Sequence, residues 1–173
     1  MTGPLNRRPL PTDHSEFHAR YVNMVPEPDL LAAVRAQTPL TRAAVLAFSD
    51  RPDHAYAPGK WSVRQMLGHM TDTERVFGFR ALSFAREDAS PLPGFEQDDW
   101  MAAADFGPYS LPDLLTEFET VRAGHLSWLR HLPDIAWERR GVASGQGVTV
   151  RSLAYMLLGH ERAHVEILRE RYS

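Results

Sequence analysis

The sequence predicts an all-α fold: a four-helix bundle with an N-terminal arm before it and a long crossover within it. Four long segments carry apolar residues at helical spacing, and the only local β character, at residues 147–150, is too short and isolated to build a sheet. A chain of 173 residues is long enough for one domain with a sizeable core. We expect an extended arm over residues 1–27, of which Phe17, Tyr21, Val22 and Met24 could pack on the body, and one bundle domain over residues 28–173.

The first two helices are predicted from periodicity and from a capping sequence. Apolar residues recur on one helical face over residues 29–49, where Pro39 predicts a kink or a break. Ser62 followed by Gln65 three positions later is typical of a capping box, in which the two residues satisfy each other's backbone N–H groups. The second helix is therefore expected over residues 63–87.

The second half of the chain predicts a crossover and two further helices. Residues 95–109 are polar and aromatic, with a short helix expected near residues 98–104. An amphipathic pattern over residues 111–131 ends before Pro133, which cannot continue a helix. Thr149 can cap a last helix that runs almost to the C-terminus.

Composition excludes several classes of function. The formal net charge is -3 and the basic residues are scattered, so nothing provides the concentrated positive face that nucleic acid requires. No apolar run approaches the roughly 20 residues of a membrane span, and no signal-peptide pattern opens the chain. The chain has no cysteine, which leaves histidines and carboxylates as metal ligands. We expect a cytoplasmic protein.

Three histidines are candidate metal ligands. His160 and His164 are four residues apart, so on a helix both imidazoles lie on one face. Apolar residues share that face, which predicts that both imidazoles point into the bundle, where unpaired polar groups are costly. His69 can face the same interior from the second helix. On spacing alone, surface or hydrogen-bonded core histidines remain the more common explanation.

The same region matches a protease motif in part. Residues 160–164 read HERAH and so fit H-E-x-x-H, in which the glutamate serves as general base of a metalloprotease. Only nine residues follow His164 in the 173-residue chain, which leaves no room for a downstream ligand on another helix. The extension with glycine and a third histidine is also absent. These differences disfavour a protease.

Three stretches together resemble the DinB/YfiT-like superfamily. Residues 56–69 read YAPGKWSVRQMLGH, residues 158–168 read LGHERAHVEIL, and residues 91–100 contain PLPGF and DDW. The resemblance spans roughly residues 28–170. It implies a four-helix bundle of up-down-down-up order that holds one divalent metal ion, zinc or nickel, through three histidines. Those ligands correspond to His69, His160 and His164.

The resemblance also implies a class of reaction. Three neutral imidazoles leave at least one coordination position free, as in a catalytic centre. Relatives of this superfamily include enzymes that use bacillithiol or mycothiol, so we expect a low-molecular-weight-thiol S-transferase that acts on small electrophiles in detoxification or stress response. Metal-dependent hydrolysis of small amides or esters and a non-catalytic metal- or ligand-binding bundle stay open as alternatives. The family further implies a homodimer.

Neighbours of the ligands are candidates for orienting an imidazole or handling a proton. Asp72 and Thr73 lie one turn beyond His69, and Glu161 adjoins His160. Capping and surface salt bridges explain these residues equally well. Trp61 is expected either to line the mouth of the site or to pack as a hydrophobic staple beside the Ser62 cap.

Overall fold

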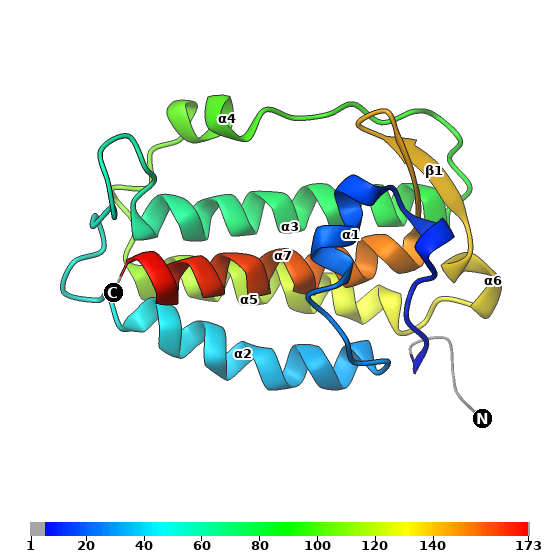
Figure 1. The fold of residues 1–173 in the computed structure, drawn as a ribbon, viewed down its shortest axis with the longest axis horizontal. Coiled ribbons are helices and arrows are strands. Elements are labelled where there is room, and N and C mark those ends of the chain that lie inside the picture. The colour runs from blue at the N-terminus through cyan, green and yellow to red at the C-terminus, as the bar shows by residue number, and fades with distance from the viewer. Residues whose placement is uncertain (1–5, 173) are drawn as a thin grey trace.

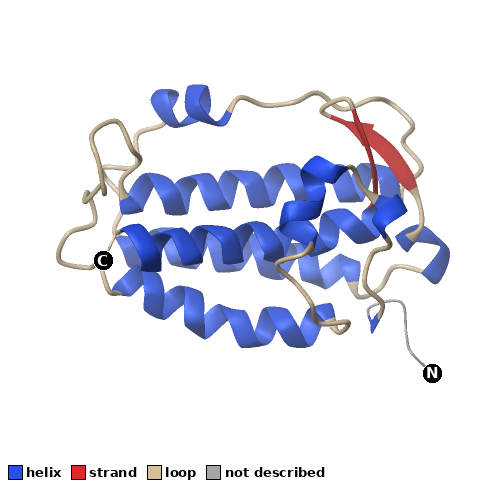
Figure 2. Cartoon of the chain, viewed as in Figure 1, coloured by secondary structure: helices blue, strands red, loops and turns tan. Residues whose placement is uncertain are grey.

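The computed structural model describes residues 6–172, and the first five positions of the predicted arm lie outside the described residues. Four long helices form the body of the molecule: α2 (Leu30–Leu46), α3 (Val63–Ala85), α5 (Leu111–Leu129) and α7 (Val150–Arg171). Helix α7 packs against α2 and α3, and α5 packs against the same two helices. The predicted four-helix bundle is therefore confirmed (Figures 1 and 2).

The helix order follows from the crossover. Helix α3 runs opposite to α2, and the chain then returns along the outside of the bundle through α4 (Gln97–Ala103) before α5 begins (Figure 1). Helix α5 consequently runs parallel to α3, and α7 runs back beside both. This is the up-down-down-up order that the resemblance implied.

Caps begin the helices where the sequence predicted them. The hydroxyl of Ser62 accepts from the backbone N–H of Gln65, whose side chain accepts from the N–H of Ser62 in return. Thr149 caps α7 in the same way through the N–H of Ser152. Helix α3 ends two residues earlier than predicted because Glu87 adopts the left-handed conformation, with φ of 65°.

Proline does not break the first long helix. Pro39 lies inside α2, which continues for a further seven residues to Leu46. The hydroxyl of Thr38 donates to the carbonyl of Val34 one turn back. The break that Pro39 suggested is thus absent, and the helix is one element with Asp29 as its cap.

The N-terminal segment is not the extended arm that the sequence suggested. A 3₁₀ turn at Pro11–Asp13 (η2) precedes helix α1 (Glu16–Val22), which packs against α7. Val22 and Val25 are fully buried in the core. The backbones of α1 and α7 approach each other closely here, because a Cβ on Gly159 would lie 1.9 Å from the carbonyl oxygen of Tyr21. Glycine at this position lets α1 rest on α7.

A β-hairpin is the second departure from the prediction. Strands β1 (Arg140–Ala143) and β2 (Gln146–Thr149) pair antiparallel after a short helix α6 (Asp134–Trp137). Ser144 and Gly145, between the strands, both have positive φ, which matches the right-handed twist of two-residue hairpins. The hairpin exchanges hydrogen bonds with Leu92 of the crossover. It therefore fastens the crossover to the bundle.

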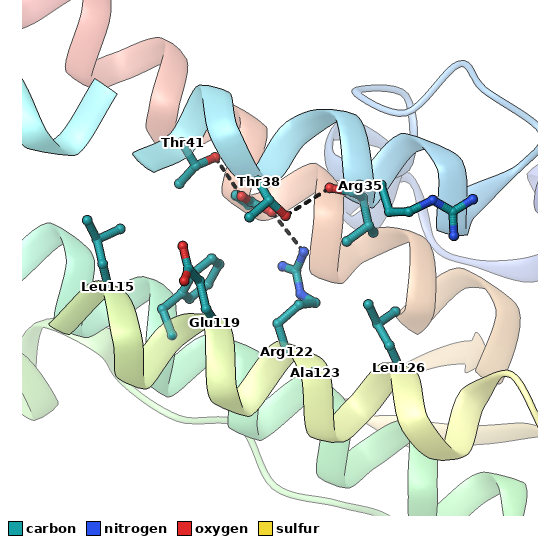
Figure 3. Close-up of a pocket in the computed structure, with 11 residues that line it drawn as sticks. Arg35, Thr38, Thr41, Leu115, Glu119, Arg122, Ala123 and Leu126 are labelled. Atoms are coloured by element: carbon teal, nitrogen blue, oxygen red, sulfur yellow. Dashed lines mark hydrogen bonds and ion pairs between the residues drawn. The ribbon is translucent and has the colours of Figure 1, made fainter. Parts of the chain in front are cut away.

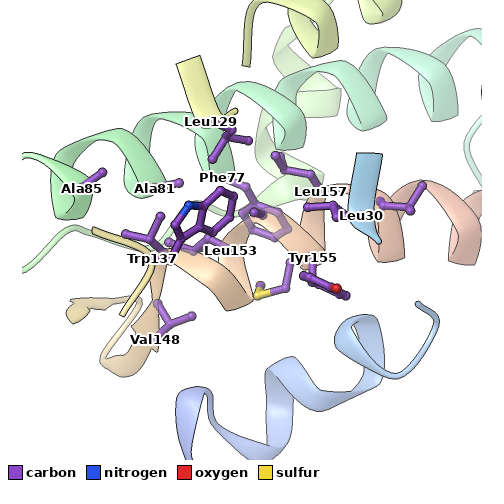
Figure 4. Close-up of a cluster of buried hydrophobic side chains, with 14 of the residues drawn as sticks. Leu30, Phe77, Ala81, Ala85, Leu129, Trp137, Val148, Leu153, Tyr155 and Leu157 are labelled. Carbon is purple, nitrogen blue, oxygen red and sulfur yellow. The ribbon is translucent and has the colours of Figure 1, made fainter. Parts of the chain in front are cut away.

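The apolar core has two parts. One lies where α6 and the hairpin close the bundle, with Trp137, Leu153 and Phe77 among its members (Figure 4). The other lies nearer the C-terminus of α7 and includes Met66 and Leu168. Along α7 the first part ends at 158 and the second begins at 165. The polar residues between them form a belt across the middle of the bundle.

Candidate metal centre

The three predicted histidines meet in this belt. His69 comes from α3, and His160 and His164 come from successive turns of α7. The Nε2 atom of His160 lies 3.1 Å from the Nε2 of His69 and 3.1 Å from the Nε2 of His164. All three candidate ligand atoms lie within 4.8 Å of one another. The structure thus brings together the residues that the sequence singled out.

The spacing of the nitrogens suits a single small cation. Two nitrogens at zinc–nitrogen bond lengths, separated by a right angle to a tetrahedral angle, lie roughly 2.9–3.4 Å apart. The two contacts of 3.1 Å fall within this range. Hydrogen bonding alone satisfies the cluster poorly, because the Nε2 of His160 carries either one proton or one lone pair and so can form only one good hydrogen bond to its two neighbours. The donor set fits a divalent ion.

Burial keeps the three imidazoles in the form that binds metal. His69 is 2% exposed and His160 is 4% exposed. Burial lowers the pKa of His69 to about 4 and that of His164 to about 3, and it lowers the pKa of His160 well below the usual value. All three are therefore neutral at pH 7, which is the ligating state of histidine.

Aromatic rings and a hydroxyl surround the imidazoles. Tyr21 of α1 and Phe77 of α3 contact the ring of His160 edge-on, at centroid distances of 5.2 and 5.9 Å. Trp61 lies 4.6 Å from the ring of His69, so its indole borders the site directly. The Oγ1 of Thr73 lies 3.5 Å from the Nε2 of His69, on the side where the ligand atoms converge.

The two candidate carboxylates turn toward arginines. Asp72 pairs with Arg75 at 3.3 Å. Glu161 accepts from Arg122 at 2.8 Å and from Thr41 at 2.6 Å. Neither carboxylate hydrogen-bonds to one of the three imidazoles among residues 6–172, so a catalytic role for either one stays a prediction.

Arg122 is the centre of a second buried cluster in the belt. It binds Glu74 through two nitrogens and Glu161 through a third, and Glu74 also contacts His125. Burial alone would raise the pKa of Glu74, but the charge of Arg122 and the hydrogen bonds hold it below the usual value. Figure 3 shows Arg122 projecting from α5 toward α2, beside a cavity of about 240 Å³. This cluster ties α3, α5 and α7 together.

Two other cavities reach the histidines. One, of about 390 Å³, is bordered by His69 and His160 and by residues of α1, α3 and the crossover. The other, of about 380 Å³, is bordered by His164 and Trp61. Gln97 and Asp98 of the crossover line both cavities. Phe95 lines the first, whereas Trp100 lies in a separate groove on the outer side of α3.

Sequence reasoning missed the contribution of α1 to this site. His18, Arg20 and Tyr21 line the larger cavity, although the segment was expected to be extended. His18 is buried. The available signal was Gly159 immediately before His160, since a glycine inside a helix indicates a close approach of another backbone.

Comparisons with known proteins agree with this fold. A family model described as the DinB superfamily matches residues 33–168, which is most of the chain. The chain therefore belongs to the DinB superfamily.

Individual relatives are distant but cover nearly the whole chain. A protein of Geobacillus thermodenitrificans named "Putative metal-dependent hydrolase" is 24% identical over 147 residues, covering 82% of this chain and 83% of its own. A Bacillus licheniformis protein with the same description is 23% identical and covers 95% of this chain and 91% of its own. The solved structure of YfiT from Bacillus subtilis, titled a "probable metal-dependent hydrolase with an unusual four-helix bundle topology", matches with a TM-score of 0.70 at 18% identity, covering 98% of this chain and 96% of that one. That likeness shows a shared fold.

Proposed function

We propose that this chain binds one divalent metal ion, zinc or nickel, through His69, His160 and His164 and transfers a low-molecular-weight thiol, such as bacillithiol, to a small electrophile. The observation that carries the proposal is the convergence of three neutral imidazoles, two of which, those of His69 and His160, line a cavity of about 390 Å³. A divalent ion held there supplies Lewis acidity, which lowers the pKa of a thiol or water that contacts it.

The surrounding residues suit this role. Three neutral ligands leave the charge of the ion uncompensated, which favours an anionic species such as a thiolate beside it. Tyr21 and Phe77 cover the imidazole of His160 with apolar ring surface and so limit the access of bulk water. Thr73 places its hydroxyl where it can hydrogen-bond to a bound group. Because the chain has no cysteine, the thiol would arrive as a co-substrate.

The openness of the site argues against a purely structural metal. A non-catalytic bundle would be expected to enclose its ion or to have a closed pocket. Here two cavities border the histidines, one on the side of α1 and one beside Trp61. A small molecule can therefore reach the ligand atoms.

Hydrolysis is the second candidate, and the names of the relatives favour it. The same three histidines would then serve a reaction in which water takes the place of the thiol, with a small amide or ester as substrate. The two reactions differ in one requirement, which is the presence of a thiol. The homodimer and the cytoplasmic location remain predictions of the resemblance and of the composition.

The test is a pair of assays on tag-free protein loaded with zinc or nickel. Bacillithiol or cysteine with 1-chloro-2,4-dinitrobenzene reports thiol transfer, and p-nitrophenyl acetate without thiol reports hydrolysis. We expect product in the first assay that requires both metal and protein and that persists in His131→Ala, which removes an exposed imidazole. Thiol-independent ester cleavage would establish the hydrolase instead, and no metal-dependent turnover across a panel of such substrates would contradict both.

A further inference from the structure

The larger cavity continues along α3 from the histidines to a buried arginine. His69, Thr73, Phe77 and Arg80 succeed one another on the face of α3 that lines it. Phe77 contacts the ring of His160, and Arg80 lies three residues further along the helix. The guanidinium therefore belongs to the same cavity as the metal centre but does not take part in it.

Arg80 differs from the other buried arginines in what it pairs with. Arg122 binds the carboxylates of two glutamates, and Arg151 binds the carboxylate of Glu138. Arg80 is only 4% exposed, yet it forms no ion pair with a carboxylate among residues 6–172. A buried cation without an anion is costly. Burial accordingly lowers the pKa of Arg80.

A structural role explains only some of the hydrogen-bond donors of the Arg80 side chain. The Nη2 atom of Arg80 donates to the carbonyl of Pro93 at 2.7 Å and to the hydroxyl of Ser144 at 2.9 Å, which links the crossover to the hairpin. A neutral donor would serve for these two acceptors. The Nε and Nη1 atoms of Arg80 have no hydrogen-bond partner in the described part of the chain, and they remain free for a ligand.

The other charges around the cavity leave it open to an anion. Arg20 also lines it, stacked on the rings of Phe17 and Tyr21 and without a carboxylate partner in the described range. Glu96 and Asp98 stand at the rim, where both are exposed, and neither pairs with Arg20 or Arg80. Arg80 is thus the buried cation of this cavity, whereas Arg20, like the two acids, is exposed.

We propose that Arg80 binds an anionic group of the substrate, a carboxylate or a similar small oxyanion, while the reacting end of the same molecule lies at the three histidines. Arg20 supplies a second positive charge, and the guanidinium of Arg80 can bind the two oxygens of a carboxylate together. The inference rests on the proposed function and narrows its substrate to a small organic acid. The acid must reach about one helical turn, roughly 5 Å, beyond the imidazole of His160.

The first test uses metal-free protein, so that no ion competes for the carboxylate. Hexanoate and 1-hexanol differ in charge but little in shape, and saturation-transfer NMR at pH 7 measures the affinity of each. We expect hexanoate to bind wild type about tenfold or more tightly than hexanol, and Arg80→Met to remove this preference. Arg86→Met, which removes an exposed arginine of the same helix end, should leave it unchanged.

Further measurements locate the binding and guard against an unfolded variant. Circular dichroism checks each variant, and Arg80→Lys should retain part of the preference. In wild type, hexanoate should shift the imidazole resonances of His18, which lines the same cavity. Equal binding of hexanoate and hexanol to wild type, or a preference that survives in folded Arg80→Met, would overturn the anion site.

The metal proposal is tested separately in the same set of proteins. Arg80→Met should take up as much zinc as wild type, because Arg80 contacts none of the three histidines in the described structure. Wild type that prefers hexanoate but takes up no metal would contradict the proposed function and leave the anion site standing. Wild type that takes up metal but binds hexanoate no more tightly than hexanol would contradict the anion site and leave the metal-binding proposal standing.

Discussion

At the scale of single residues, the cost of burying ionisable groups in the belt is reduced in two ways. Arg122 meets two carboxylates, so its charge is neutralised within the protein. The three histidines instead lose their charge, because burial lowers their pKa values, and their ring nitrogens lie close to one another. The first arrangement is complete without a ligand, whereas the second has the geometry to hold a cation.

The buried cluster predicts a large loss of stability when its arginine is removed. Arg122→Met leaves Glu74 and Glu161 buried without their counter-charge, which should lower the free energy of unfolding by about 3–5 kcal/mol. Arg75→Met breaks only exposed ion pairs and should cost less than about 1 kcal/mol. Urea unfolding of the two variants beside wild type measures the difference. Equal losses in the free energy of unfolding would show that the buried ion pairs contribute no more to stability than the exposed ones.

The three clustered histidines could be predicted from the sequence, but the rest of the site could not. The spacing of His160 and His164 placed both on one helical face, helix periodicity let His69 face the same interior, and the resemblance implied that all three are ligands. The pairing of Arg122 with Glu161, and the missing partner of Arg80, depend on which helices become neighbours. A single chain pattern does not contain that information.

At the scale of elements, the sequence predicted a feature correctly where all of the interacting residues lie close together in the chain. The caps at Ser62 and Thr149 involve atoms three residues apart, and both formed as predicted. Helix α1 and the hairpin were missed because each depends on distant contacts: α1 on α7, and the hairpin on the crossover at Leu92. Short elements gain most of their stability from such packing.

The contact between α1 and α7 predicts opposite effects for two glycine substitutions. Gly159→Ala would drive a Cβ into the carbonyl of Tyr21, so α1 must shift, at a cost of about 1–3 kcal/mol. Gly124→Ala, in α5, meets nothing within 4 Å and should stabilise the protein by about 0.5–1 kcal/mol. Thermal unfolding of both variants provides the comparison. A neutral Gly159→Ala would mean that α1 does not rest on α7 in solution.

At the scale of the whole molecule, the crossover determines how the site is built. It returns the chain so that α3 and α5 run parallel (Figure 1). Its residues Gln97 and Asp98 line both cavities that border the histidines. Among the described residues no helix is long and apolar enough to cross a membrane. The resemblance, and not periodicity, predicted the helix order, since antiparallel and parallel neighbours have the same pattern of apolar residues.

Metal-free protein should lose stability in mild acid. The pKa of His69 is about 4 and that of His164 about 3 in the folded state, against about 6.5 in an unfolded chain. The unfolded state therefore binds more protons below pH 6.5, so the free energy of unfolding should fall as pH decreases from 6.5 toward 4. Each unit of difference is worth about 1.4 kcal/mol. Urea midpoints at successive pH values measure this slope.

A matched variant identifies the source of that slope. His69→Gln should reduce the slope but not abolish it, because His160 and His164 remain, and His131→Ala, at an exposed position, serves as the control. Stability that is constant between pH 6.5 and 4.5 in metal-free wild type would mean that the imidazoles titrate normally and are not buried as described.

The most direct measurement is the metal content of tag-free protein by mass spectrometry, after identical loading of wild type, His160→Ala and His131→Ala. Three converging histidines predict about one ion per chain in wild type and in His131→Ala, and almost none in folded His160→Ala. Wild type that cannot be loaded, or His160→Ala that retains a full equivalent of metal, would contradict the three-histidine centre.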